Sequence, residues 1–168
     1  IVKKTTHWYL RFDMFQSWLE EYIESHAKDW KDNVLQQTRS WLRQGLAERA
    51  ITRDLTWGVK LNDIKGLDSA KVEGKALYVW FDAVLGYISA TKTHMQMLAS
   101  EGIGSAEDWK LWWQSPDTRY LAFIGKDNIV FHTLIFPAML HARGENYILP
   151  DNVPANEFLN LEGQKFSK

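Results

Sequence analysis

The stretch YLAFIGKDNIVFHTLIFPAML, residues 120–140, decides the fold class. Its first five residues are an apolar run, which is typical of a strand that is buried on both faces. Gly125 then allows a turn, and apolar residues recur at helical spacing in a helix predicted over residues 128–142. An earlier run, ALYVWF at residues 76–81, predicts another buried strand, and a helix is predicted after it as well. Strand, helix, strand, helix predicts an α/β fold with a parallel sheet.

The segments on either side of this unit are of different kinds. Towards the N-terminus, a short strand at residues 5–10 precedes two helices that begin near Asp13 and Asn33, the second ending at Gly45. Towards the C-terminus, residues 150–154 are predicted to be a loop and residues 157–161 a last strand. Two parallel strands do not make a stable sheet, so we expect further strands outside this chain.

Composition excludes several classes of protein. The chain has 45% apolar and 24% charged residues, as soluble globular domains do, and 20 Lys plus Arg balance 21 Asp plus Glu. No basic surface for DNA is indicated, and no apolar run approaches the roughly 18 residues of a membrane helix. The absence of cysteine excludes disulfides and cysteine-bound zinc in this segment and fits the cytoplasm. The first residue is not Met, so we expect the chain to start within a longer protein.

Two segments, residues 80–87 and residues 125–132, follow the predicted strands. Both are expected at one crevice, because ligands of open parallel sheets bind at the carboxyl ends of strands. In the second segment, Gly125 permits a close approach of the backbone, and Asp127 offers two acceptor oxygens for a ribose diol. The alternative is that Asp127 only caps the following helix. Near the C-terminus, Lys165 and Lys168 suit a loop that stabilises phosphate charge, or else belong to a solvated tail.

Three side chains of the two segments are compatible with an apolar slot for a thioether: Trp80, Tyr87 and His132. Sulfur–aromatic contacts contribute roughly 0.3–1.5 kcal/mol each. The alternative is ordinary core packing, with His132 as a buried histidine whose hydrogen bonds are satisfied. There is no Walker loop, no GxGxxG, no metal-spaced His pair and no nucleophile elbow, so kinases, dehydrogenases and zinc hydrolases have no motif here.

Three motifs occur in this order: YVWFDAVLGYIS (residues 78–89), FIGKDNIVFHTLIFPAML (residues 123–140) and EFLNLEGQKFSK (residues 157–168). Together they resemble the methionyl-tRNA synthetases. TTHWYLRFDMFQSWL (residues 5–19) and SWLRQGLAERAITRDLTWG (residues 40–58) resemble the end of that family's connective insertion. The resemblance implies a mainly helical segment over residues 1–58, followed over residues 59–168 by the second half of a split Rossmann-type parallel sheet.

The resemblance also implies roles for individual residues. The positions that match the methionine side-chain pocket are Trp80, Ala83, Tyr87 and His132, together with Val84, where the family often has Pro. Gly125 and Asp127 match the positions that hold the ATP ribose. Lys165 and Lys168 match lysines of the KMSKS signature at the ATP site, whose start corresponds to residues 165–168. This chain has Phe166 where the signature has Met. Arg53 matches a family arginine near the active site.

The implied activity is a methionine–tRNA ligase that uses methionine, ATP with Mg²⁺, and tRNA-Met, and of which this chain is an incomplete, inactive part. The HIGH signature, the zinc knuckle and the anticodon-binding domain are expected outside it. Two alternatives stay open: another class I synthetase, of the leucine or isoleucine type, and a non-catalytic module that binds tRNA or a protein partner.

Overall fold

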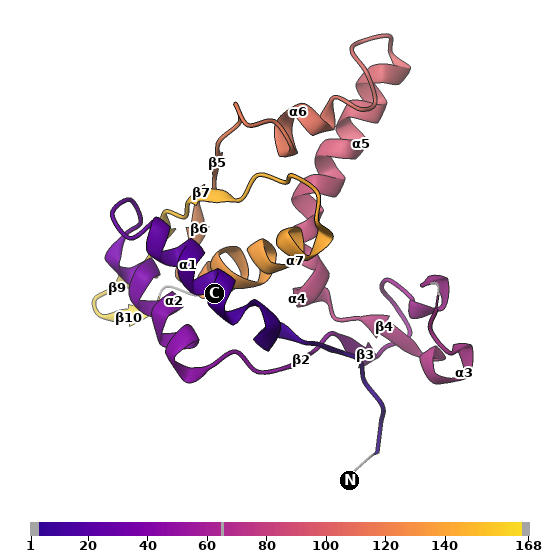
Figure 1. Cartoon of the computed structure of the whole chain (residues 1–168), viewed down its shortest axis with the longest axis horizontal. Coiled ribbons are helices and arrows are strands. Elements are labelled where there is room, and N and C mark those ends of the chain that lie inside the picture. The colour runs from indigo at the N-terminus through magenta and orange to yellow at the C-terminus, as the bar shows by residue number, and fades with distance from the viewer. Residues whose placement is uncertain (1–3, 65, 166–168) are drawn as a thin grey trace.

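The N-terminal third is a helical hairpin, as predicted. The computed structural model describes residues 4–64 and 66–165. Strand β1 (Tyr9–Leu10) and a 3-10 turn (Phe12–Phe15) lead into α1 (Gln16–Ser25), and α2 (Asp32–Gln44) runs back beside it (Figure 1). Gly45 ends α2 with φ 79°, a backbone conformation that favours glycine. Strand β2 (Arg49–Ala50) pairs antiparallel with β1 and returns the chain to its start.

Two short pairs of parallel strands confirm the α/β class. Strand β5 (Tyr120–Leu121) pairs with β7 (Pro150–Asn152), and β6 (Ile124–Gly125) pairs with β8 (Ala155–Asn156). The predicted loop at residues 150–154 is therefore wrong. This segment accepts backbone hydrogen bonds from Ala122 and Ile124, and its prolines sit at a strand start and between strands, where no donor is needed.

The run at residues 76–81 is not a buried strand of the parallel sheet, and this prediction is wrong. Strand β4 (Lys75–Leu77) pairs antiparallel with β3 (Thr52–Asp54), and helix α4 (Val79–Asp82) begins directly after Tyr78. Val79 and Trp80 are 46% and 50% exposed, so their apolar character does not come from burial in a sheet. The 3-10 turn Leu61–Asp63 and the short helix α3 (Ser69–Val72) lie between β3 and β4.

The helix predicted over residues 128–142 is confirmed, but it is not regular. It begins as a 3-10 turn (Lys126–Asn128), widens to a π-helix (Phe131–Ile135) and ends as α7 (Phe136–Arg143). Pro137 has no N–H for the carbonyl one turn earlier, and the Thr133 hydroxyl donates to the Ile129 carbonyl at 2.9 Å. Both features disturb the i→i−4 pattern where the helix widens.

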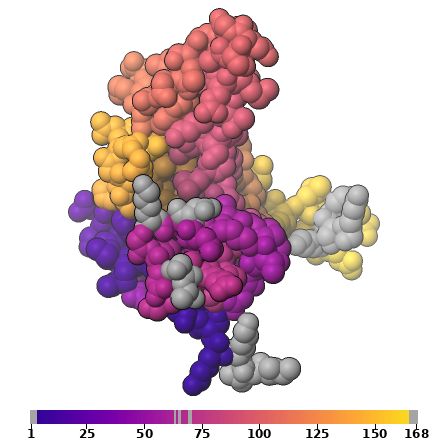
Figure 2. Space-filling model, turned by 90° about the vertical axis from the view of Figure 1, so that its right-hand side faces the viewer, coloured from indigo at the N-terminus to yellow at the C-terminus, as the bar shows by residue number. Residues whose placement is uncertain are grey.

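Helix α7 connects two hydrophobic cores. On one side it packs with the α1–α2 hairpin and the parallel strands, around Leu19, Ile23, Val34 and Leu134. On the other side Phe136 and Leu140 pack with α5 (Gly86–Ser100) and α6 (Trp109–Trp113), which project from the rest of the molecule (Figures 1 and 2). A 3-10 turn (Ala83–Leu85) joins α4 to α5.

The described part of the chain ends in a β-hairpin rather than a single strand. Strands β9 (Asn160–Leu161) and β10 (Gln164–Lys165) pair antiparallel through Glu162 and Gly163, which both have positive φ. The prediction of a strand at residues 157–161 holds only for the last two residues. None of the helices in the described parts of the chain is both long and apolar enough to span a bilayer.

Candidate active site

A hollow of about 410 Å³ lies where α4 and α5 face the start of the irregular helix. Six of the residues singled out in the sequence line it: Trp80, Ala83, Val84, Tyr87, Gly125 and His132. The two segments expected at one crevice therefore do meet there. They meet for a different reason than predicted, since the first segment comes from α4 and α5 rather than from a parallel strand.

His132 is held by two hydrogen bonds that define its tautomer. Its Nδ1 lies 2.9 Å from the Asn128 carbonyl, and its Nε2 lies 3.0 Å from the Tyr87 hydroxyl. Because a carbonyl only accepts, Nδ1 carries the proton, and Nε2 of the neutral ring accepts from the Tyr87 hydroxyl. Burial lowers the pKa of His132, against a smaller opposing effect of the Asn128 hydrogen bond, so the ring is neutral at pH 7.

The walls of the hollow are aromatic and open to solvent on one side. The rings of Trp80 and Phe131 lie 5.6 Å apart, centroid to centroid. Trp80 and Tyr87 are 50% and 44% exposed, so they are not ordinary core residues, whereas His132 is only 4% exposed. The hollow thus combines an apolar surface with one fixed polar pair, the arrangement that small-molecule sites commonly have.

Gly125 lines the hollow, whereas Asp127, two residues later, is not among the lining residues. A Cβ added to Gly125 would lie 2.8 Å from Oδ1 of Asp127, so a glycine here leaves room for that carboxylate. Asp127 is exposed and lies in the first turn of the irregular helix, where its Oδ1 accepts from Asn128 Nδ2 at 3.5 Å. Both expectations for Asp127, ribose binding and helix capping, therefore stay predictions. Its carboxylate oxygens are accessible to a ligand in solution.

Arg53 lies on the far side of the aromatic wall. It lines an adjoining hollow of about 340 Å³ that shares Trp80 and Phe131 with the first. Its Nη1 donates to the carbonyls of Thr52 at 2.7 Å and Ala50 at 3.2 Å, and its guanidinium carbon lies 3.9 Å from the centre of the Tyr78 ring. These contacts hold a cationic group close to the candidate site.

The predicted phosphate-binding lysines and a metal site are not found among the described residues of this hollow. The backbone of Lys165 ends strand β10, while Lys168 lies outside the described residues. Within the described parts of the chain, no three His, Cys, Asp or Glu side chains are grouped as a metal site would require.

Four residues of the hollow were not singled out in the sequence: Phe123, Ile124, Asn128 and Phe131. The last two belong to the segment that was expected at the crevice. Phe123 and Ile124 were assigned to the interior of a buried strand. The predicted strand is interrupted between β5 and β6, and Phe123, which lies in this interruption, is 76% exposed. Phe131 faces the hollow from the π-helical segment, a type of helix that apolar periodicity does not indicate.

Comparison with known proteins gives one consistent result. The family described as "tRNA synthetases class I (M)" matches residues 1–168. A methionine–tRNA ligase of Chloroherpeton thalassium is 56% identical over 172 residues, covering 100% of this chain and 23% of the relative. A methionine–tRNA ligase of Flavobacterium psychrophilum is 55% identical over 168 residues, covering 99% of this chain and 22% of the relative.

A solved structure gives the same fold. The methionyl-tRNA synthetase of Mycobacterium tuberculosis bound by methionyl-adenylate superposes with a TM-score of 0.67 at 23% identity, over 95% of this chain and 27% of that one. The chain thus spans about a quarter of the length of the relatives it matches. Because the family match extends over every residue, the chain belongs to the tRNA synthetases class I (M).

Proposed function

We propose that this chain is part of a methionine–tRNA ligase of the cytoplasm. The enzyme would join methionine to ATP as methionyl-adenylate, with release of pyrophosphate, and then transfer the methionyl group to tRNA-Met. The observation that carries the proposal is the 410 Å³ hollow, with its aromatic walls and its Tyr87–His132 pair. The names of the relatives at 55–56% identity support it and do not favour a leucine or isoleucine enzyme.

In this proposal the hollow binds the methionine side chain. Trp80, Phe131 and Tyr87 would contact the thioether, and each sulfur–aromatic contact contributes roughly 0.3–1.5 kcal/mol. Ala83 and Val84 would fill the base of the slot. Shape alone discriminates about 10–200-fold per methylene, so a rigid wall is needed to exclude shorter and branched side chains. A neutral His132 suits this role, because a fixed charge would disfavour an apolar side chain.

The rim of the hollow would bind ATP. Gly125 allows close approach of the nucleotide, and the exposed carboxylate of Asp127 would accept hydrogen bonds from the ribose diol. Lys165 and Lys168 would stabilise charge on the phosphates with Mg²⁺ as counter-ion, and Arg53 would add a further positive charge from β3. The methionine carboxylate would attack the α-phosphorus, and the protein would contribute positioning and charge stabilisation.

The test is amino-acid-dependent exchange of pyrophosphate with ATP, measured on the full-length enzyme that carries this segment, with all twenty amino acids in turn. We expect exchange with methionine alone. Exchange with a different amino acid would keep the mechanism and overturn the assignment of the hollow. No exchange from a folded enzyme would favour a non-catalytic module that binds tRNA. The isolated chain, which has only part of the site, is expected to be inactive.

A further inference from the structure

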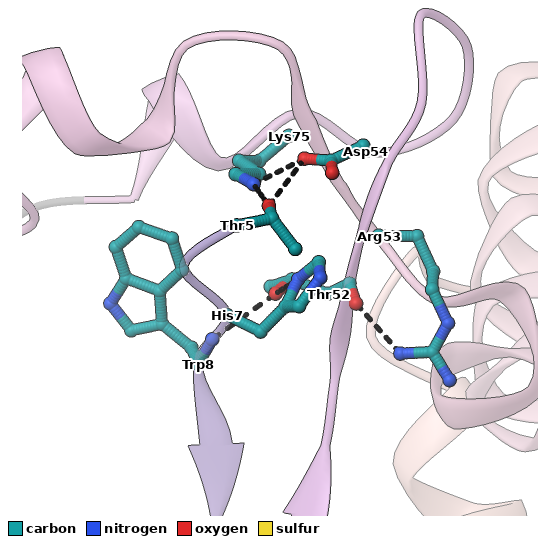
Figure 3. A network of polar contacts seen from close by, with 7 residues as sticks. All are labelled: Thr5, His7, Trp8, Thr52, Arg53, Asp54 and Lys75. Carbon is teal, nitrogen blue, oxygen red and sulfur yellow. Dashed lines mark hydrogen bonds and ion pairs between the residues drawn. The ribbon is translucent and has the colours of Figure 1, made fainter. Parts of the chain in front are cut away.

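Lys75 is an unusual residue, because it is a buried cation. Among the residues whose side chains the structure describes, it is the one Asp, Glu, Lys or Arg that is buried, with 7% of its surface exposed. Its ammonium pairs with the Asp54 carboxylate and donates to the Thr5 hydroxyl at 2.6 Å (Figure 3). The Thr5 hydroxyl donates in turn to Asp54 at 3.1 Å. A buried charge is tolerated only when it is paired and hydrogen-bonded in this way.

The three residues come from three segments that are distant in sequence. Thr5 lies in the N-terminal segment, Asp54 ends β3, and Lys75 begins β4 directly opposite Asp54. Two residues earlier in β3, the buried Thr52 hydroxyl accepts a hydrogen bond from the Trp8 amide at 3.1 Å. The same hydroxyl forms a hydrogen bond with Nδ1 of His7 at 3.1 Å. Alternate residues of β3 are therefore anchored to the N-terminal segment on one face of the strand.

Arg53 lies between these two anchors and points to the opposite face (Figure 3). Successive side chains of a strand alternate between faces, and a slip of one residue would exchange them. With Asp54 opposite Lys75, Arg53 lies over the Tyr78 ring and lines the hollow that shares Trp80 with the candidate methionine site. In a register shifted by one residue, the guanidinium would point away from that site.

We propose that Lys75 is a positioning residue for adenylate formation. Its ion pair with Asp54, supported by Thr5, fixes the register of β3 and so holds the Arg53 guanidinium beside the reacting groups, where it stabilises the negative charge that develops on the phosphate. This inference rests on the proposed function. Lys75 itself lines neither of the two hollows, so its role is positional.

The test is a double-mutant cycle on the full-length enzyme, read out by methionine-dependent pyrophosphate exchange well below each variant's thermal midpoint. Arg53→Ala is expected to lower kcat about 100-fold, the loss typical of removing one group that stabilises transition-state charge, with little change in KM for methionine. Lys75→Met should lower kcat by about 10–100-fold in the same way. The double variant should be no slower than Arg53→Ala alone, because both changes remove one interaction.

Matched variants separate positioning from folding. Thr5→Val removes one hydrogen bond of the network at constant shape, and we expect a loss in kcat of about 3-fold or more. Thr5→Ser retains the hydroxyl and should restore the activity, also where Lys75→Met does not fold. Lys71→Ala breaks the exposed pair with Asp68 nearby and should leave kcat unchanged.

Losses that multiply in the Lys75→Met, Arg53→Ala double variant would overturn the inference, as would equal kcat values for Thr5→Val and Thr5→Ser. In both cases the wild-type enzyme would still exchange with methionine, so the proposed function would stand. Absence of methionine-dependent exchange in the wild type would instead overturn the proposed function, and this inference with it.

Discussion

At the scale of single residues, His132 and Tyr87 are expected to determine the affinity for methionine. His132→Ala removes a wall of the hollow and leaves the Tyr87 hydroxyl without its acceptor, so KM for methionine should rise about tenfold or more, since such losses amount to about 1–3 kcal/mol. Tyr87→Phe removes only the hydroxyl and should have a smaller effect. KM for ATP serves as the control and should stay nearly constant. Equal increases in both constants would contradict the role of His132.

The buried imidazole also predicts how stability depends on pH. Burial lowers the folded-state pKa of His132 below its ordinary value of about 6.5, which applies to the unfolded chain. Between these two values the unfolded chain binds more protons, so the free energy of unfolding falls as the pH drops below about 6.5 and levels off below the folded-state pKa. The stabilisation is fully present above about pH 6.5.

A comparison with His132→Gln isolates this contribution from those of the other histidines. Free energies of unfolding of wild type and variant would be measured by urea denaturation from pH 5 to pH 8. The difference between them should change with a slope of no more than about 1.4 kcal/mol per pH unit, the value for one proton. A difference that is independent of pH would mean that His132 titrates alike in the folded and unfolded states.

The sequence alone was sufficient to predict several of the residues that line the site, but not how these residues are arranged in it. Trp80, Tyr87 and His132 were predicted to meet, and they line one hollow. Their protonation and exposure were not predictable, because both depend on contacts between segments about 45 residues apart, such as the Tyr87–His132 hydrogen bond. Phe131 was missed because the π-helix changes which side chains face the hollow.

At the scale of elements, the main wrong prediction concerns an apolar run that is divided between a strand and a helix. Residues 76–81 read as one buried strand, yet Ala76 is buried in β4, whereas Trp80 is half exposed in α4. Local sequence does not separate an apolar residue that packs in a core from one that lines a ligand site. The α1–α2 hairpin was predictable because its buried residues follow one regular period, and Gly45 marks its end.

The hairpin is attached to the parallel strands by a buried hydrogen bond that predicts a stability loss. The Tyr22 hydroxyl donates to the Pro150 carbonyl at 2.6 Å, and Tyr22 is 8% exposed. Tyr22→Phe would leave a buried carbonyl without its partner, at a cost of about 1–3 kcal/mol in the free energy of unfolding. Urea denaturation measures the loss. Tyr9→Phe, at a position 55% exposed, is the control and should stay within about 0.5 kcal/mol of wild type.

At the scale of the whole molecule, the class of fold was predictable and its extent was not. The alternation of apolar segments and helices indicates parallel strands, and β5–β7 and β6–β8 confirm them. Each strand is only two or three residues long, and the described sheets contain two strands each. Because the chain spans about a quarter of the length of the relatives it matches, we expect any strands that extend these pairs to lie in the rest of the longer protein.

The small sheets leave apolar side chains exposed, which predicts association of the isolated 168-residue chain. Leu121 and Phe123 near the parallel strands are 45% and 76% exposed, and Leu159 and Leu161 in the projecting C-terminal hairpin are 76% and 63% exposed (Figures 1 and 2). Open strand edges beside such side chains promote pairing between copies. Sedimentation velocity should therefore detect dimers or larger species.

The sheet region rather than exposed apolar surface in general should cause this association. Phe123→Lys places a charge beside the strand edge and should shift the distribution towards monomer. Leu111→Lys changes a side chain that is 63% exposed on α6, away from the strands, and should leave the distribution as in wild type. If both variants dissociate alike, association depends on total apolar exposure. A wild-type chain that sediments as a clean monomer would mean that the short strand edges do not template pairing, although their backbone groups are open.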